Sequence, residues 1–336
     1  MLRERWRQGL AVACLVALTI GLLLPFHVAP WRAWWDIATY AVRSRHGLSA
    51  ALIAMAPLEF CALATIVCWR SGLLYLGFDG CYLGGALGAI LTAIVWPGLS
   101  PWAFLPLSLI FAFALGGFWA SLTGIARARF GGNEVLGSLM MNFVAIFIVQ
   151  YLVSGPIRAG SDLPQTAALA RAQWMPRLAG LHAHVGVLVA VLAAILLAGL
   201  LSMTRAGYVL RMTGLGPQAA RYGGIATGLV WVMAAIGGGG LAGLGGWCDV
   251  LGLQHRLIDG MGQGIGFQGI VVAILAGLHP LRTVPVAFIY AALIAGGGAM
   301  QRDFQIPSAI VSIFESLLVL TALALPALRR GRLTRA

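Results

Sequence analysis

The sequence predicts an all-α, polytopic membrane protein. We expect a bundle of about ten transmembrane helices, forming a single domain over residues 1–336 with both termini in the cytoplasm. Hydrophobic residues make up 60% of the chain and charged residues 10%, whereas a soluble domain carries about 25% charged residues. Apolar runs close to the roughly 20 residues of a bilayer span recur along the chain. The arginines are concentrated in alternate segments between these runs, as expected for a membrane protein of fixed orientation.

Ten apolar runs are candidate spans: 9–26, 48–69, 72–95, 102–123, 134–153, 184–203, 225–245, 264–279, 284–300 and 308–327. The first resembles a signal peptide because three arginines precede it, but no clear small-x-small cleavage site follows, so we predict an uncleaved span. Run 72–95 is interrupted by glycines and Asp79, and run 264–279 is short. Either could be re-entrant or discontinuous, which is tolerated where protein or water surrounds the backbone.

The distribution of arginine predicts the orientation. With the N-terminus inside, the cytoplasmic segments hold 14 of the 22 basic residues and one acid, Glu4. The outer segments hold the other eight arginines and five acids, among them Asp249 and Asp259. This asymmetry follows the positive-inside rule. The net charge of +12 therefore reflects orientation in a lipid bilayer, and nucleic-acid binding is not needed to explain it.

The absence of lysine excludes one class of site. All basic residues are arginine, and a P-loop needs a lysine on the nucleotide phosphates. If ATP drives this protein, another subunit binds it. The five cysteines show no CxxC pair and four lie in apolar runs, so we expect small buried side chains. His182 and His184 have no acidic or cysteine ligand beside them. We predict no catalytic residue, no metal site and no cofactor in this chain.

Four acidic residues lie in or at the edge of the predicted spans: Glu59, Asp79, Glu134 and Glu315. A charge at the centre of a membrane helix is unfavourable by about 2.5–3.5 kcal/mol on insertion scales, so each should face the bundle interior or a cavity. Glu59 and Glu315 fit either a polar path or a neutral, hydrogen-bonded carboxyl between helices. Glu134 follows Asn133 and suits a helix start, where a carboxylate meets the helix dipole.

Asp79 is better placed to contact a solute. Gly77 and Gly80 flank it, and glycines loosen a helix and expose backbone groups. Asn142 and Gln268 are neutral polar groups at span depth that suit an uncharged polar solute. Tyr75 and Phe267 could stack on a base or a sugar face. These five residues are our candidate substrate path. The glycine-rich runs 237–246 and 296–300 fit close helix packing, or sliding between helices.

A polar interruption, residues 204–224, separates two apolar runs. Within it, Gly216 and Pro217 can start a helix, residues 218–222 make about one and a half turns, and Gly223 with Gly224 ends it. Ala219 and Ala220 present a small face to which another protein could come close, and Arg221 suits a carboxylate partner. The alternative is an ordinary connecting loop. The outer segment 154–183 predicts an ordered loop or a short interfacial helix.

At this point the residues resemble a known family. GLGPQAARYGGI (214–225) is similar to the coupling segment of ABC importer permeases of the branched-chain amino acid/simple sugar type, nearest to the nucleoside permease branch. Matches in the same order run along about residues 70–320: SGLLYLGFDG (71–80), GGNEVLGSLMMNFVA (131–145), YLVSGPIR (151–158), GGLAGLGG (239–246) and GIGFQGIVVAILAGLHPL (264–281). Family members usually have Asn at Tyr75, Glu at Asp79, Gln at Cys81 and Asn at Gly216. The first three positions are in the predicted path. The resemblance therefore supports the assignment as a permease more strongly than it supports a nucleoside as the solute.

The resemblance implies a set of partners and a mechanism. It implies a second permease subunit, a copy or a paralogue, together with ABC ATPase subunits that bind ATP-Mg and an outer solute-binding protein. Pro217, Gln218, Ala219, Ala220 and Arg221 would dock on the ATPase and convey its closure as alternating access for a nucleoside or simple sugar. The implied location is the bacterial cytoplasmic (inner) membrane. The alternative from another class is an ATP-independent secondary transporter or channel for a small polar solute.

Overall fold

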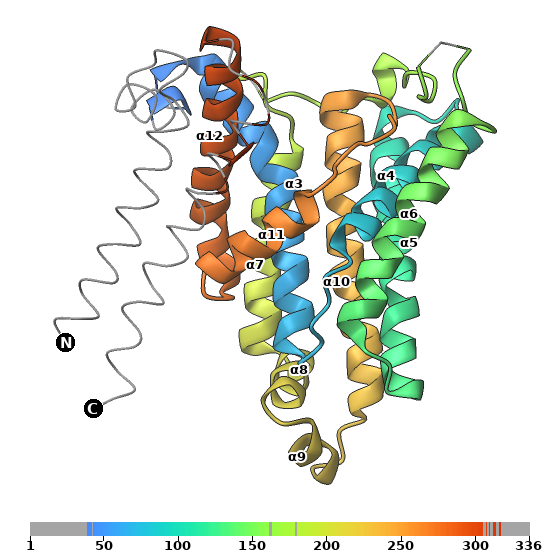
Figure 1. The fold of residues 1–336 in the computed structure, drawn as a ribbon, viewed down its shortest axis with the longest axis vertical. Helices are drawn as coiled ribbons and strands as arrows, with labels where there is room; N and C mark the ends of the chain where they lie inside the picture. Colours follow the sequence, from blue (N-terminus) through green and yellow to red (C-terminus); the bar gives the residue numbers. More distant parts are fainter. Residues whose placement is uncertain are drawn as a thin grey trace, which may run out of the picture. The chain divides into compact units, whose positions relative to one another are not determined.

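The computed structural model describes residues 39–41, 43–160, 163–178 and 180–304, together with 307, 309, 312, 313 and 316. The predicted span 9–26 and Glu315 lie outside the described residues, as does most of the predicted span 308–327. The chain divides into two compact units, one of residues 55–287 and one of residues 1–54 with 288–336. The candidate residues within the description all belong to the first of these units. Figure 1 labels the helices of the described chain.

The described chain is helical, as predicted. Its helices are α3 (Arg45–Arg70), α4 (Phe78–Val95), α5 (Pro101–Phe130), α6 (Glu134–Ser154), α7 (Gly186–Met203), α8 (Arg205–Leu215), α9 (Pro217–Tyr222), α10 (Thr227–Asp249), α11 (Ile265–Leu275) and α12 (Pro280–Phe304). A π-helix, Val250–Gln254, continues α10, and a 3-10 turn spans Arg171–Gln173. The boundaries follow local chemistry: Pro101 and Pro217 occupy first helical positions, and Gly131 ends α5 with a φ of 63°.

Seven helices among the described residues are long and apolar enough to cross a membrane. They correspond to seven of the ten predicted runs. The run 264–279 is not a full span, because α11 has 11 residues and therefore extends only about 16 Å along its axis. Left-handed backbone at Gly264 before this helix, and at Gly277 and Leu278 after it, limits its length. The possibility of a discontinuous segment here is confirmed.

Glycines set the packing of α4, α5 and α10. A Cβ atom built on Gly85 of α4 would overlap the backbone of Gly243 in α10, and one on Gly116 of α5 would lie 2.5 Å from the carbonyl oxygen of Gly239. The helix backbones therefore touch directly, as small residues allow in membrane bundles. The packing interpretation of the glycine-rich run 237–246 is confirmed.

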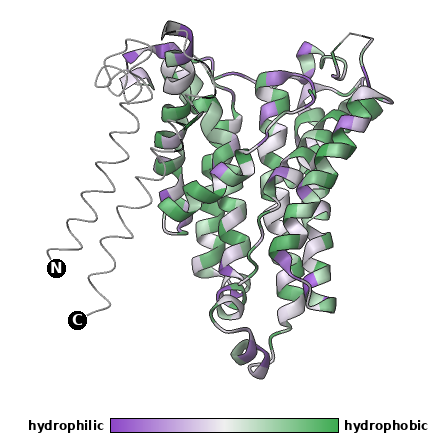
Figure 2. Cartoon of the chain, in the orientation of Figure 1, coloured by the Kyte–Doolittle hydropathy of each residue, from purple (hydrophilic) through white to green (hydrophobic). Residues whose placement is uncertain are grey.

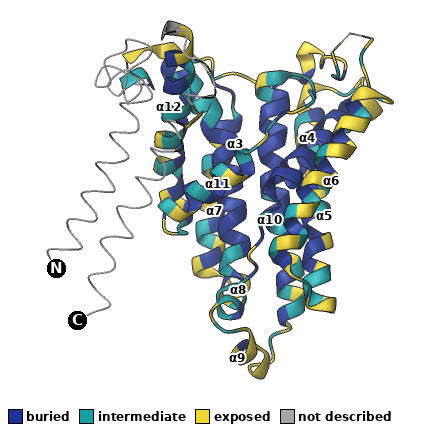
Figure 3. Ribbon diagram, viewed as in Figure 1, coloured by how far each residue is buried: buried dark blue, intermediate teal, exposed yellow. Residues whose placement is uncertain are grey.

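Polar and apolar residues are distributed as a membrane bundle requires. Figure 2 shows hydrophobic residues along the long helices and hydrophilic residues gathered in α9. In Figure 3 exposed residues lie along α5 and α6, whereas most of α4 and much of α10 are buried. Exposed apolar faces on α5 and α6 suit contact with lipid tails.

In the second unit, the Arg302 guanidinium donates to the Tyr40 hydroxyl at 3.4 Å.

Candidate functional site

The segment 71–77 connects the lower end of α3 to the start of α4 without regular secondary structure. In Figure 1 it runs back between α3 and α10 from the end of the bundle that carries α8 and α9. Two side chains of α6 hold its far end. The Leu76 N–H donates to Ser138 Oγ at 3.0 Å, and Asn142 Nδ2 donates to the Leu76 carbonyl at 3.3 Å. The break in the helical path is therefore held by hydrogen bonds to a neighbouring helix.

Asn142 also caps α4 from a distance. The first N–H groups of a helix have no partner within the helix, and the residue before α4, Gly77, supplies no side chain to cap them. Asn142 Oδ1 accepts the Gly80 N–H at 2.8 Å across 62 residues of sequence. A Cβ atom on Gly80 would lie 3.2 Å from this amide oxygen and 2.8 Å from the Trp119 indole nitrogen. Glycine is thus required here for close approach.

Asp79 joins α4 to α11. Its Oδ1 accepts the backbone N–H of Gly266, in the first turn of α11, at 2.6 Å. A Cβ atom on Gly266 would lie 2.5 Å from the Asp79 nitrogen, so these backbones are in close contact. A carboxylate that accepts a backbone N–H at a helix start also meets the positive end of the helix dipole. Asp79 is therefore held at the meeting point of α4 and α11.

Three of the five predicted path residues lie at or contact the start of α4, and the other two follow Gly266 in α11. Tyr75 is fully buried with its hydroxyl 3.2 Å from Cys81 Sγ, so its ring is not open to a solute in this conformation. Phe267 and Gln268 directly follow Gly266, and the Phe267 side chain is 42% exposed. The structure thus places Tyr75, Asp79 and Asn142 at the start of α4, with Phe267 and Gln268 on the adjoining helix. Contact of these residues with a solute stays a prediction.

Sequence reasoning missed a second buried polar pair. The Tyr82 hydroxyl donates to the carboxylate of Asp249, 167 residues away. Asp249 was predicted in an outer segment, and this was wrong because α10 runs past residue 245 and buries it. The Tyr82 ring also fills the space that a Cβ atom on Gly262 would occupy. This pair ties α4 to the end of α10.

Glu59 forms a hydrogen bond with another helix. It is fully buried, and the Thr283 hydroxyl in the first turn of α12 lies 2.5 Å from its Oε1. The structure therefore supports the alternative in which Glu59 is a hydrogen-bonded carboxyl between helices. Glu134 begins α6 as predicted, with Asn133 capping the helix through bonds from the backbone nitrogens of Val135 and Leu136. Glu134 also forms an ion pair with Arg127 of α5.

The segment 204–224 contains two helices, α8 and α9. Thr204 caps α8 by accepting the Gly207 N–H at 3.1 Å. As predicted, α9 begins at Pro217 and ends before Gly223. Pro217, Gln218, Ala219 and Arg221 are exposed, but Ala220 is 3% exposed, so its methyl group packs against this chain. Two large side chains that sequence reasoning missed are also exposed, Leu215 at 85% and Tyr222 at 94%. Leu215 and Tyr222 therefore extend the surface that Pro217, Gln218, Ala219 and Arg221 offer to a partner.

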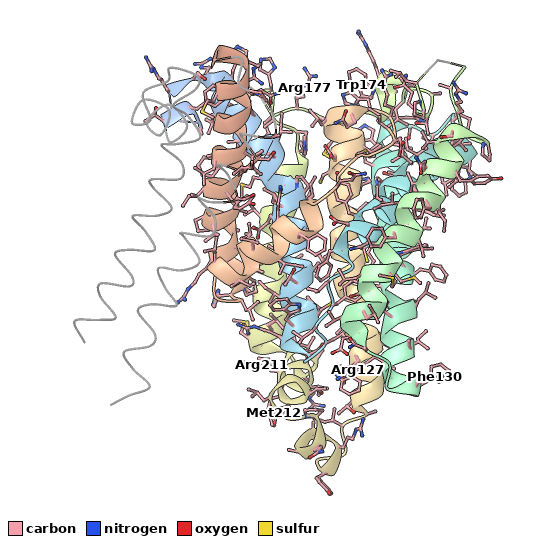
Figure 4. All side chains as sticks on the ribbon, viewed as in Figure 1. Arg127, Phe130, Trp174, Arg177, Arg211 and Met212 are labelled. Atoms are coloured by element: carbon pink, nitrogen blue, oxygen red, sulfur yellow. The ribbon has the colours of Figure 1, made fainter. Side chains whose placement is uncertain are left out.

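The segment 155–185 lies at the opposite end, where Figure 4 labels Trp174 and Arg177. Its described residues, 155–160, 163–178 and 180–185, form an ordered loop with one short 3-10 turn, as predicted. Backbone bonds from Thr166 to Leu257 and from Leu169 to His255 attach it to the connection between α10 and α11. The Trp174 and His255 rings stack at 3.7 Å. His184, just outside α7, is buried, and this burial, followed by the proximity of His255, lowers its pKa to about 4.

An apolar cavity of about 690 Å³ lies elsewhere, between α7, α8 and α10 among other helices. Leucine, valine, alanine and other apolar side chains line it, and a polar solute would find no hydrogen-bond partners there. It is therefore not part of the candidate path. The described residues contain no cluster of three His, Cys, Asp or Glu side chains that could hold a metal ion.

These features define a multi-pass membrane protein with a discontinuous polar centre and an exposed helical segment at one end. Residues 47–323 match the family described as the permease component of the branched-chain amino acid transport system, and the chain belongs to this family. It is therefore the permease component of an ABC importer, a transport subunit and not an enzyme, and an ATP-independent carrier is not favoured. Membership implies ATPase and solute-binding-protein partners.

Three relatives are similar over most of their length. The chain is 31% identical to the glucose ABC transporter permease protein TsgB13 of Haloferax volcanii, over 91% of this chain and 84% of that protein. It is 27% identical to the nucleoside ABC transporter permease protein NupB of Lactococcus lactis, over 91% and 88%. It is 28% identical to the guanosine ABC transporter permease protein NupP of Bacillus subtilis, over 93% and 89%.

Proposed function

We propose that this chain is one of two permease subunits, a copy or a paralogue of each other, that surround a single solute path in a bacterial cytoplasmic membrane. The α8–α9 end faces the cytoplasm and docks on ATPase subunits, which bind ATP and Mg²⁺. An outer solute-binding protein delivers the solute to the opposite end. Closure of the ATPase subunits moves α9, and the path opens alternately to the two sides of the membrane.

The exposed surface of α9 is the observation that carries this proposal. Pro217, Gln218, Ala219 and Arg221 are open to a partner, and Tyr222 is almost fully exposed beside them. Figure 1 shows α9 at one end of the bundle, beside the start of α10 and beyond the ends of α3, α5, α6 and α7. An exposed tyrosine next to an arginine is typical of the residues that contribute most to protein interfaces. A protein partner explains this surface, whereas a carrier that works alone does not need it.

The solute is a small polar molecule, a nucleoside or a simple sugar. The names of the relatives include glucose, nucleoside and guanosine. Sugars and nucleosides both present hydroxyl groups and one flat or apolar face. Gln268 can donate to and accept from hydroxyl groups, and the exposed ring of Phe267 can stack on an apolar face. Both residues follow the contact between Asp79 and Gly266, where α4 and α11 meet.

The first experiment tests the coupling surface. The tagged chain is extracted from its membrane in mild detergent, and the proteins that co-purify are identified. We expect an ATPase subunit with the wild type and its loss with Arg221→Glu, because reversal of the charge repels a carboxylate partner and places an acidic group in the interface.

Arg177→Glu is the matched control, since Arg177 is exposed at the opposite end of the bundle. It makes the same charge change and should keep the ATPase. Recovery of the wild-type chain without any ATPase, in several mild detergents, would refute the proposal. Equal loss of the ATPase with both variants would refute the assignment of α9 as the coupling surface.

A further inference from the structure

Trp231 lies one turn after the start of α10, next to Arg221 of the proposed coupling helix α9. The Arg221 Nε of α9 donates to the Thr227 hydroxyl at 2.7 Å, and Thr227 is the first residue of α10. Thr227 and Trp231 are four residues apart and so share one face of the helix. The Arg221 guanidinium carbon lies 5.9 Å from the centre of the Trp231 ring, within the range of a cation–π interaction. Trp231 is 7% exposed.

The indole of Trp231 also reaches the candidate path. Its Nε1 donates to the carbonyl oxygen of Ser71 at 3.1 Å, across 160 residues of sequence. Ser71 is the first residue of the segment 71–77, which leads through Tyr75 to the Asp79 carboxylate at the start of α4. The coupling helix and the non-helical part of the path are therefore linked through one buried side chain.

A close backbone contact runs beside this link. Gly72 has a φ of 82°, and a Cβ atom there would lie 3.2 Å from the Cα of Gly214 near the end of α8. A Cβ atom on Gly214 would in turn overlap the carbonyl of Arg70. Since nothing larger than hydrogen separates these backbones, a shift of α8 displaces the start of the segment 71–77.

A second arginine touches the same ring. The Arg127 guanidinium carbon of α5 lies 5.0 Å from the centre of the Trp231 ring, and Arg127 also pairs with Glu134 at the start of α6. A cavity of about 130 Å³ adjoins Arg127, Glu134 and Thr123. The Thr123 hydroxyl is buried and has no hydrogen-bond partner among the described residues. The Arg127 side chain therefore has both a charged and an aromatic partner, with free space beside it.

From these contacts we propose that Trp231 is a positioning residue that transmits movement of α9 to the segment 71–77. This inference rests on the proposed function, in which an ATPase moves α9. The indole N–H holds Ser71, while the ring holds the guanidiniums of Arg221 and Arg127. A movement of α9 thereby changes the position of the segment that leads to Asp79, without a direct contact between α9 and that segment.

The test uses the complete complex, reconstituted in liposomes with the partner permease, the ATPase and the solute-binding protein. The reporter is Leu74→Cys, because Leu74 is 48% exposed in the segment 71–77. Four native cysteines are buried, and Cys14, outside the described residues, is replaced by serine. Maleimide labelling of residue 74 is measured without nucleotide and with ATP and vanadate, alongside the number of solute molecules transported per ATP hydrolysed.

In Trp231→Phe we expect the ATP-dependent change in the labelling rate to fall about fivefold, the equivalent of one hydrogen bond of about 1 kcal/mol. Solute transported per ATP should also fall, while the ATPase still co-purifies. If Trp231 had a purely structural role, the variant would yield less complex, but the number of solute molecules transported per ATP hydrolysed would be unchanged. Thr227→Val removes the hydroxyl that accepts the Arg221 hydrogen bond, at nearly constant side-chain volume. It should also lower the number of solute molecules transported per ATP. This second variant provides the test if Trp231→Phe does not fold.

Trp247→Phe is the matched control. Trp247 lies on the same helix, is buried, and loses an equivalent bond, from its Nε1 to Ser108 Oγ at 2.8 Å. It should keep both the labelling response and the transport ratio. A wild-type response in Trp231→Phe and Thr227→Val, or an equal loss in Trp247→Phe, would overturn this inference alone. Absence of an ATPase from the wild-type complex would instead refute the proposed function.

Discussion

Asn142 provides a direct test of how the break before α4 is stabilised. In Asn142→Ala two hydrogen bonds are lost, and the buried N–H of Gly80 has no acceptor. Each hydrogen bond contributes about 1 kcal/mol, and an unsatisfied buried donor adds a penalty of about 1–3 kcal/mol. We therefore expect the free energy of unfolding to fall by about 3–5 kcal/mol. At about 2 °C per kcal/mol, this lowers the midpoint of thermal unfolding by about 6–10 °C.

The assay is thermal unfolding in mild detergent with a fluorogenic thiol dye, because the described cysteines are buried and react once the chain opens. Asn133→Ala is the matched control. Asn133 also accepts two backbone N–H groups, but it caps α6 at an exposed position. Loss of such a cap is unfavourable by about 1 kcal/mol, which corresponds to about 2 °C. Equal shifts for the two variants would refute the argument that burial makes Asn142 the more important cap.

Two further predictions concern packing and pH. Gly85→Ala should abolish recovery of folded protein, because the new methyl group would overlap the backbone of Gly243, whereas Gly98→Ala, with no neighbour within 4 Å, should be recovered normally; equal recovery would contradict the close packing. The lowered pKa of His184, about 4 against 6.5 when unfolded, means that only the unfolded chain gains a proton as pH falls through 6.5. Stability is therefore highest above pH 6.5 and declines toward pH 4, by about 2 kcal/mol between pH 7 and pH 5. His184→Leu should show a smaller decline in thermal stability over this interval, and an unchanged decline would show that other groups cause it.

Local chemistry allowed the sequence to predict much of the secondary structure. Pro217 and Gly223 delimit α9 because proline suits a first helical turn and glycine suits its end. The helix that Glu134 begins, and the close packing of the run 237–246, followed from residue type in the same way. The orientation and the spans outside the described residues stay predictions.

The polar contacts of the candidate site could not be predicted from the sequence. The bonds from Gly266 to Asp79 and from Trp231 to Ser71 join residues 187 and 160 positions apart. Hydrophobic periodicity carries no information on such pairs. Tyr75 was interpreted as a stacking surface, but whether an aromatic ring is open or buried depends on how α4 packs. The extension of α10 past residue 245 was missed because it depends on close contacts of Gly245 with α3 and of Gly246 with α4, whose residues are distant in the sequence.

The direct backbone contacts among α4, α5 and α10 have an evolutionary consequence. At Gly85, Gly116 and Gly243 a side chain of any size collides with the neighbouring helix, so these positions offer no intermediate substitutions through which sequence drift could proceed. Divergence in solute preference must then accumulate on the surrounding elements, such as α11 and the segment 71–77. The three helices would be inherited as a fixed frame while their surroundings change.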